Sequence, residues 1–469
     1  MDLLFLSRRI YMPDEDTLVN GGILFTNDGK IRKIFKTPDS VNSFLYNTEA
    51  ESIIDFEDKI LMPGLIDPSV HINEPGRKDW EGFVSATKSA AAGGFTTIAD
   101  IPLNSTPPIT SVEGLKAKTA LARGKLHVDV AFWGGLVPGN INEIWGLIRA
   151  GVVGIKCFLY PSGDDDFPEV NLDDVTAALK KIEGTGSILA FHAEMLQSEK
   201  ITADQNNPKK YKSYLDTRPS SLEMNAVDMI VKLATKYKLR THILNLSSAD
   251  ALPLIAECKK SGGNLSVETC PHYLSISAEN IEDAHTEFKS APPIREQANQ
   301  DKLWQGILNK DIDLIASDHI SPTPGPKCLT YGRKRGDFLN ACSGISSLQL
   351  SLPIIWTKGQ QYGIGLKDIY RLLCLNPAKL CGIDNIKGKF EEGYDADFCI
   401  WDPDEEFLVS PEIIYSQNKA NPYMGQRLRG TVHATVVRGL HVFQRYEGFG
   451  QPLGRVILRK TDRKIVKFA

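Results

Sequence analysis

Five residues of the kinds that bind metal ions or move protons stand at the ends of short apolar runs in this sequence: His71, Lys156, His192, His272 and Asp318. Each has a structural explanation when it occurs alone, since a single buried histidine is usually a hydrogen-bonded core residue. Five such residues, each on a separate apolar run, are more than would be expected if all were ordinary buried residues. Together they indicate metal-assisted hydrolysis of an amide or a similar bond.

Lys156 and Asp318 carry most of this chemistry. Lys156 lies within the apolar run GVVGIKCFL, where an ammonium group must be paired or become neutral. A neutral amine can react with carbon dioxide to form a carbamate, an anionic oxygen ligand able to bridge two divalent metal ions. Asp318, in IASDHI, can bind one ion and accept a proton from metal-bound water, whose pKa the ion lowers.

The runs that carry these residues alternate with helical segments. Strand-like runs recur from Leu65 to His319 as GLIDPSVHI, GFTTIADIPL, LHVDVAFWGG, GVVGIKCFL, SILAFHAE, RTHILNLSS, LSVETCPHYL and IDLIASDH. Helical spacing over Trp80 to Ala92 predicts a helix that ends at Gly93. Eight such units predict an α/β fold, a (β/α)8 TIM barrel with functional residues at its strand ends. A doubly wound open sheet is the alternative, weakened because no GxGxxG sequence opens the first unit.

The two ends of the chain have a different character. Residues 1–60 and 385–469 contain short apolar runs and turns without long helical patterns. Small isolated sheets bury too little surface to be stable, so the two ends are expected to form one small β-sandwich domain rather than two separate appendages. The sequence therefore predicts a β-sandwich built from residues 1–60 and 385–469, beside a barrel of residues 61–384.

Composition limits the class of partner. The chain has 469 residues, 42% hydrophobic and 24% charged, with a net charge of -4. This balance predicts neither nucleic-acid nor membrane binding, and no apolar run has the length of about 20 residues that crosses a bilayer. The eight cysteines include no CxxC pair and are expected to be small buried residues in a reducing compartment. A cytoplasmic location is the resulting expectation.

Several motifs resemble the amidohydrolase superfamily over nearly the whole length of the chain. They include LMPGLIDPSVHINEPGRKDWEGF, DIPLNSTPPIT, GIKCFL, FHAE, VETCPHYL, SAPPIR, SDH and KGKFEEGYDADFCIWDP. Within this superfamily the chain resembles the cyclic-amide hydrolases, which comprise allantoinases, dihydroorotases and dihydropyrimidinases. The allantoinase family fits best, because Asn73 takes the place of an arginine that grips the substrate carboxylate in dihydroorotases. The resemblance implies purine catabolism by hydrolytic opening of the hydantoin ring of allantoin to allantoate. A dihydropyrimidinase or hydantoinase is the runner-up.

The resemblance also implies a set of site residues. It implies two divalent metal ions, with zinc the expected ion, bridged by carboxylated Lys156. The six ligand positions fall on Ser69, His71, Lys156, His192, Asn245 and Asp318. Asp318 is also the expected catalytic residue. Asn73 and the backbone around Ser343, Gly344 and Ile345 are the expected substrate contacts. His242, three residues before Asn245, is expected on the opposite face of its strand and outside the site.

Two of the six ligand positions lack the expected imidazole, because they hold Ser69 and Asn245. A hydroxyl or an amide oxygen binds zinc less well than imidazole does, so each ion is expected to bind weakly. The alternatives are slow catalysis with weakly held metal, a rearranged site with one ion, or a noncatalytic binding or scaffold protein. The expected partner is a small-molecule substrate, and a homotetramer is expected by analogy with relatives.

Overall fold

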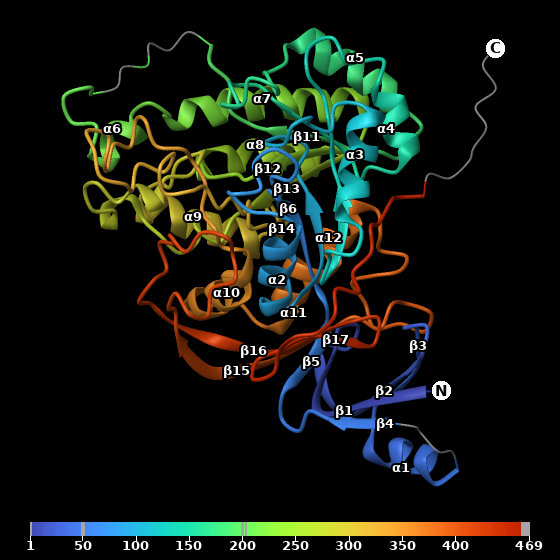
Figure 1. Ribbon diagram of the computed structural model, residues 1–469. Helices are drawn as coiled ribbons and strands as arrows, with labels where there is room; N and C mark the ends of the chain where they lie inside the picture. The colour runs from blue at the N-terminus through green and yellow to red at the C-terminus, as the bar shows by residue number, and fades with distance from the viewer. Residues whose placement is uncertain (1, 48–51, 198–200, 202–203, 461–469) are drawn as a thin grey trace, which may run out of the picture.

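The computed structural model describes residues 2–47, 52–197, 201 and 204–460, and Figure 1 shows their arrangement. A barrel of parallel strands with surrounding helices forms the larger part. A β-rich domain lies beside it and contains both the first and the last strands of the chain. The protein is thus a (β/α)8 TIM barrel with a small β-sandwich domain, as the sequence predicts.

Each predicted barrel run forms a strand. The barrel strands are β6 (Leu65–Val70), β7 (Phe95–Asp100), β8 (Asp129–Phe132), β9 (Gly134–Gly135), β10 (Ile155–Phe158), β11 (Leu189–His192), β12 (Thr241–Leu244), β13 (Leu265–Thr269) and β14 (Leu314–Ile315). The run LHVDVAFWGG supplies both β8 and β9. Neighbouring strands pair in parallel in the orders β6-β7-β8 and β9 to β14. A parallel bridge from Val70 to His319 joins the first strand to the segment after the last, so the doubly wound alternative is wrong.

Helices follow the strands and cover the barrel. They are α2 (Phe83–Ala92), α3 (Val112–Ala122), α4 (Ile144–Ala150), α5 (Leu172–Ile182), α6 (Tyr211–Leu215), α7 (Ser220–Tyr237), α8 (Leu252–Lys260), α9 (Gln297–Leu308), α10 (Ser351–Gly359), α11 (Leu366–Tyr370) and α12 (Asn376–Cys381). Helix α2 ends at Gly93, as the sequence predicts, but it begins at Phe83 rather than at Trp80, since Gly82 is its N-cap. Helix α5 begins with a capping box in which Asn171 and Asp174 satisfy each other's backbone N–H groups.

The β domain is built around a sheet that combines both ends of the chain. Its strands are β1 (Asp2–Met12), β2 (Thr17–Thr26), β3 (Ile31–Phe35), β4 (Ser52–Asp55), β5 (Ile60–Pro63), β15 (Phe398–Leu408), β16 (Arg427–Val437), β17 (Leu440–Gln444) and β18 (Gly448–Phe449). Helix α1 (Pro38–Asn47) packs on β2 and β3. Antiparallel pairing of β5 with β15 joins the two chain ends. Residues 48–51 and 461–469 of the predicted domain lie outside the described residues, and the boundaries at residues 60 and 385 stay predictions.

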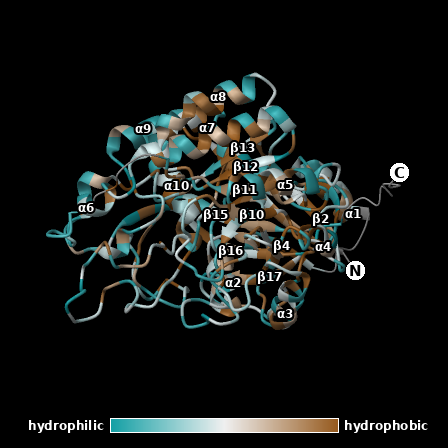
Figure 2. Cartoon of the chain, turned by 90° about the horizontal axis from the view of Figure 1, so that it is seen from above, coloured by the Kyte–Doolittle hydropathy of each residue, from teal (hydrophilic) through white to brown (hydrophobic). Residues whose placement is uncertain are grey.

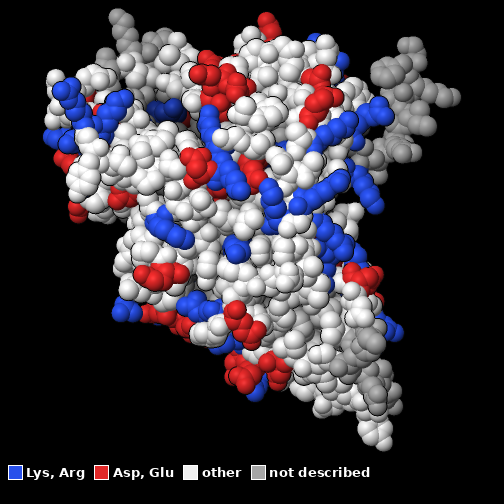
Figure 3. Space-filling model, viewed as in Figure 1, with Lys and Arg blue, Asp and Glu red and all other residues white. Residues whose placement is uncertain are grey.

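Burial follows the two-part architecture. In Figure 2 the strands around β12 and β13 are mostly coloured hydrophobic, whereas the helices around them carry both hydrophobic and hydrophilic residues. A separate apolar cluster that includes Phe5, Phe25 and Phe398 fills the β domain. Basic and acidic side chains are interspersed on the face in Figure 3. Seven of the eight cysteines are buried, with Cys342 partly exposed. Among the described helices, none combines the length and the apolar character needed to cross a membrane.

Candidate functional site

A pocket opens where the carboxyl ends of the barrel strands meet. Its cavity volume is about 310 Å³, enough for a small molecule. Nine of the sequence-predicted site residues line it, namely His71, Lys156, His192, Asn245, Asp318, His272, Ser343, Gly344 and Ile345. Their positions follow from the fold, because each of the first five stands in or just after a barrel strand.

Asp318 lies at the centre of the polar groups. Its Oδ1 is 3.5 Å from His71 Nε2, and its Oδ2 accepts a hydrogen bond from Asn245 Nδ2 at 3.2 Å. Burial raises the pKa of Asp318, but the His71 hydrogen bond and the nearby Lys156 outweigh it and hold the pKa below its usual range. The carboxylate is therefore ionised at neutral pH and has donors at both oxygens.

A chain of hydrogen bonds fixes the tautomer of His71. The Arg77 guanidinium donates to Asn104 Oδ1, so Asn104 Nδ2 must face His71 Nδ1, which lies 3.2 Å away. Because a guanidinium only donates, His71 Nδ1 accepts and the proton of the neutral ring is on Nε2, towards Asp318. Burial also lowers the pKa of His71. The nitrogen nearest Asp318 is thus a proton donor rather than a free metal ligand.

Lys156 is a buried amine without a carboxylate partner among the described residues. Its side chain is 2% exposed, and its Nζ lies 5.1 Å from the ring centroid of Phe158. Burial lowers the pKa of Lys156, although Asp318 and Glu268 oppose this shift. A lowered amine pKa favours the neutral form that carbamate formation requires, as the sequence argument anticipated.

His192 is oriented by a buried ion pair. Its Nε2 hydrogen-bonds Glu194 at 2.7 Å, and Glu194 also pairs with Arg218. Burial raises the pKa of Glu194, but Arg218 and His192 lower it to about 2. The ring stacks on Phe158 with centroids 4.6 Å apart. With a proton on Nε2, the lone pair of His192 is on Nδ1.

Asn245 reaches the pocket because the backbone turns at the end of β12. Its φ of 40° breaks the strand alternation. Its Nδ2 donates to Ala291 O at 3.3 Å as well as to Asp318, and its Oδ1 has no partner in the described part of the chain. The amide thus occupies the expected imidazole position and binds the carboxylate.

His242 lies outside the pocket, as expected, but it does not lie on the opposite face of its strand, which was the reason given for that expectation. His242 does not line the pocket, but its strand register aligns it with Ala190 and, through that residue, with Lys156. It therefore lies on the same inner face as Lys156. Hydrogen bonds to Ser266 at 2.8 Å and Glu268 at 3.0 Å hold it inside the barrel.

Ser69 and Asn73 lie outside the set of pocket-lining residues. Ser69 is 1% exposed, and its N–H donates to Asp67 Oδ1 at 3.0 Å. Asn73 is completely buried with a φ of 62°, and neither polar atom of its side chain has a partner among the residues described. The substrate-binding role of Asn73 stays a prediction.

Two buried lysines hold the loop that carries Ser343, Gly344 and Ile345. Lys327 Nζ donates to Cys342 O at 3.2 Å and Gly344 O at 2.6 Å, and Lys289 Nζ donates to Ala341 O at 2.6 Å. Burial, then the neighbouring Lys289, lowers the pKa of Lys327 to about 7. The Nζ atoms of the two lysines thus donate hydrogen bonds to backbone carbonyls on both sides of Ser343 and fix one wall of the pocket.

Replacing Lys327 by Met is expected to lower the free energy of unfolding by about 1–3 kcal/mol, because buried carbonyls lose their donor. Denaturant unfolding measures this change. Lys334→Met, at an exposed position of the same loop, is the matched control and should change stability by less than about 0.5 kcal/mol. Equal effects of the two substitutions would contradict the role assigned to Lys327.

Sequence reasoning did not assign four further pocket residues, which are Arg77, Trp80, Asn104 and Arg218. Arg77 and Trp80 belong to the EPGRKDW segment, and Asn104 belongs to DIPLNS. These motifs carry the family resemblance, and their position after strand ends could have indicated a role in the site. Arg218 has no such signal, since it comes from a segment between α6 and α7.

The donor set does not fit a centre of two metal ions. An imidazole is missing at two positions, the Asn245 amide binds Asp318 through its nitrogen, and His71 carries its proton towards Asp318. A cation would have to displace these hydrogen bonds, and at the positions of Ser69 and Asn245 it would gain only a hydroxyl or an amide oxygen. Lys156, His192 and Asp318 nevertheless keep the ligand types that the resemblance implies.

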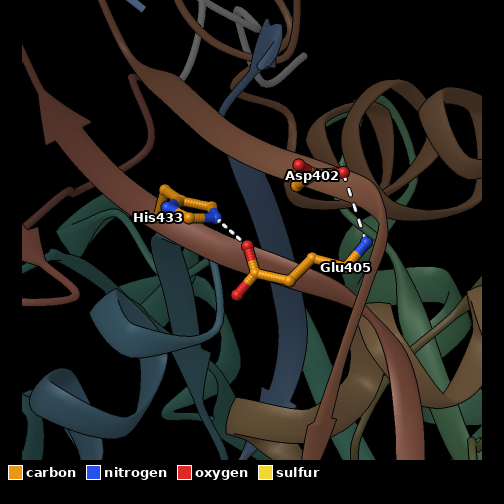
Figure 4. Close-up of side chains that lie close together, drawn as sticks. All are labelled: Asp402, Glu405 and His433. Atoms are coloured by element: carbon orange, nitrogen blue, oxygen red, sulfur yellow. Dashed lines mark hydrogen bonds and ion pairs between the residues drawn. The ribbon is translucent and has the colours of Figure 1, made fainter. Parts of the chain in front are cut away.

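Two other groups of carboxylates within the described residues could be considered for metal ions. In the group in Figure 4, Glu405 binds His433 at 2.6 Å, and Asp402 accepts from the Glu405 N–H and from Lys59 at 2.9 Å. The other group, Asp129, Asp395 and Asp397, surrounds the ammonium of Lys387. Each group thus already contacts a protein cation, Lys59 in the first and Lys387 in the second.

Known proteins resemble this chain in sequence and in fold. Residues 60–442 match the amidohydrolase family. The allantoinase of Streptomyces avermitilis is 44% identical over 87% of this chain and 89% of its own length, and the allantoinase of Arabidopsis thaliana is 42% identical over 83% and 79%. The solved L-hydantoinase (dihydropyrimidinase) of Arthrobacter aurescens is 30% identical, with a TM-score of 0.88 over 98% of this chain and 100% of that one. The chain therefore belongs to the amidohydrolase family.

Proposed function

We propose that this chain binds allantoin in the barrel-mouth pocket and opens its hydantoin ring to allantoate at a low rate, because Ser69 and Asn245 stand where the family resemblance implies metal-binding histidines. The observation that carries the proposal is the pocket itself, in which His71, Lys156, His192 and Asp318 keep their places while Asn245 binds Asp318. The allantoinase names of relatives with 39–44% identity support this substrate.

The residues present divide the work between proton transfer and binding. Ionised Asp318 accepts a proton from the attacking water and returns it to the ring nitrogen when the amide C–N bond breaks, which is the catalytic role we propose for it. The backbone of Ser343, Gly344 and Ile345 holds the amide edge of the ring, in the loop fixed by Lys327. Amidohydrolases are generally metal-dependent, and zinc held by carboxylated Lys156 would activate water. The donor set of this chain fits two such ions poorly.

Asp318→Asn is expected to reduce the residual hydrolysis of allantoin by about 100-fold or more, because the amide cannot accept the proton. The measurement is allantoate formation by the purified protein, with and without added zinc, manganese or cobalt. Asp165→Asn, an exposed position, serves as the control and should leave the rate unchanged. Residual activity that survives Asp318→Asn would refute the proposed proton acceptor.

The competing enzyme reading is a dihydropyrimidinase or hydantoinase, which the name of the Arthrobacter aurescens structure favours. Ring preference separates the two, since those enzymes should prefer dihydrouracil or unsubstituted hydantoin. We propose that allantoin is preferred, because the Asn73-Glu74-Pro75-Gly76 segment has the allantoinase-like form. Faster opening of dihydrouracil would overturn this assignment.

A noncatalytic binding or scaffold protein is the second candidate. The observation that favours it is that Asp318 already accepts a hydrogen bond from Asn245 and lies 3.5 Å from His71 Nε2, so the carboxylate has protein partners without a metal ion. Absence of allantoate formation under every metal condition, together with retained allantoin binding, would support this candidate. The homotetramer stays a prediction, as does the cytoplasmic location, and one relative is described as mitochondrial.

A further inference from the structure

Three hydrogen-bonding positions in the pocket have no protein partner among the described residues. They are Oδ1 of Asn245 and both ring nitrogens of His272. Both side chains line the cavity, yet Asn245 is 3% and His272 is 1% exposed. Buried polar atoms are nearly always paired, so an unpaired group at the wall of a cavity indicates a position that a ligand or water fills.

The amide orientation of Asn245 follows from its neighbours. Its nitrogen faces two acceptors, the carbonyl of Ala291 and the carboxylate of Asp318. Only the NH2 group can bind both, so Oδ1 is the atom left over and it can accept one or two N–H groups. A metal-binding imidazole at this position could not offer such an acceptor.

His272 complements this acceptor with a donor. It follows β13, and its ring packs edge-on against Tyr273 with centroids 4.3 Å apart. The Tyr273 hydroxyl is itself fixed by Pro292 O at 2.7 Å. Burial lowers the pKa of His272 to about 4, so the ring is neutral and presents one N–H donor and one acceptor nitrogen.

We propose that Asn245 and His272 form a metal-independent subsite for the N–H and C=O edge of a neutral cyclic amide. Asn245 Oδ1 accepts a ring N–H, and the N–H of His272 donates to a ring carbonyl. The inference deepens the proposed function and rests on it. It also gives Asn245 a role, because the amide that takes the place of a metal-binding imidazole contacts the ligand instead.

Calorimetric titration of the chelator-treated protein tests the subsite. Allantoin, hydantoin and 1,3-dimethylhydantoin, which has no N–H group, are the probes. The unmodified protein should bind the first two, and the dimethylated ring should bind at least about tenfold more weakly. His272→Phe should weaken hydantoin and allantoin binding by about tenfold or more. His272→Gln, which keeps a donor and an acceptor, should recover part of that loss.

Two further variants complete the test. Asn245→Leu should weaken metal-free binding, because it removes the acceptor. His285→Phe, at an exposed histidine outside the pocket, should bind both ligands like the unmodified protein. Thermal melting checks that each variant is folded.

The outcomes separate the subsite from the proposed function. Equal allantoin affinity in the unmodified protein and the folded His272→Phe variant overturns the subsite and leaves the proposed function standing. So does tight binding of 1,3-dimethylhydantoin, which would mean that ordered water alone fills these positions. Hydantoin binding that depends on His272, without allantoin binding, supports the subsite and overturns the proposed substrate. A Kd above about 10 mM for every probe overturns both.

Discussion

Replacing Ser69 and Asn245 by histidine together is expected to raise kcat/KM for allantoin by about 1000-fold and to bring bound metal to about two ions per chain. Changes around metal ligands alone commonly alter affinity or activity by about 10–100-fold. Here a ligand is missing on each of two expected ions, so the loss is expected to exceed that range. The double variant supplies both imidazoles beside His71, Lys156 and Asp318, which line the pocket already.

The two single variants test whether the restored histidines act together or independently. Ser69→His or Asn245→His alone should restore much less than half of the logarithmic gain, because residues that act as one unit are strongly non-additive. Metal analysis by mass spectrometry and an allantoate assay are the two measurements. Since Ser69 is buried, Ser69→Asn with Asn245→Gln serves as the control for added bulk and should show no gain in kcat/KM over the unmodified protein.

Two results would contradict this account. Strong allantoin hydrolysis by the unmodified chain with full metal content would show that hydroxyl and amide ligands suffice. A folded, metal-loaded double variant that remains inactive towards allantoin would show that the pocket has changed beyond its ligands. The second result would favour the binding or scaffold candidate.

The barrel and its strand-end residues could be predicted because they are local features of the sequence. Apolar runs, their spacing and a glycine after α2 are read from neighbouring residues, and the functional residues follow from the barrel rule. His71, Lys156, His192 and Asp318 were found in this way. Asn245 was found through its family position, although strand alternation gave no indication that a φ of 40° would turn it into the pocket.

The interactions that tune the site could not be predicted, because they join residues distant in the sequence. Arg218 reaches Glu194 beside His192, and the Asn104 amide that fixes the His71 tautomer comes from the loop after another strand. Lys327 supports the Ser343 loop through side-chain bonds to carbonyl groups. The spacing of residues in the sequence does not predict such long-range contacts. It also does not predict that both ring nitrogens of His272 lack a partner among the described residues, because this depends on the residues packed around the ring.

Lys387→Met is expected to lower the free energy of unfolding by about 3–5 kcal/mol, because it leaves buried carboxylates without their shared cation. Lys387 Nζ lies 2.9 Å from Asp129, 3.0 Å from Asp395 and 2.5 Å from Asp397. Arg438 also pairs with Asp129. Burial lowers the pKa of Lys387, but the three carboxylates outweigh it and hold the pKa above its usual range.

This cluster joins the two domains, which explains the size of the effect. Asp129 begins the barrel strand β8, whereas Asp395 and Asp397 lead into β15 of the β domain. Lys389→Met, two residues away on a partly exposed side chain, is the control and should cost less than about 1 kcal/mol. Urea unfolding of both variants provides the comparison, and equal losses would contradict a special role for Lys387.

The pH dependence gives an independent check on the same cluster. Burial already raises the pKa of Asp397, and loss of the Lys387 cation should raise it further above the unfolded value of about 3.9. The folded variant then binds more protons than its unfolded chain, so its stability falls as pH rises. The stability difference between the unmodified protein and Lys387→Met should therefore be smaller at about pH 5 than at about pH 8. A difference that is independent of pH would mean that lost packing, rather than unpaired buried charge, causes the destabilisation.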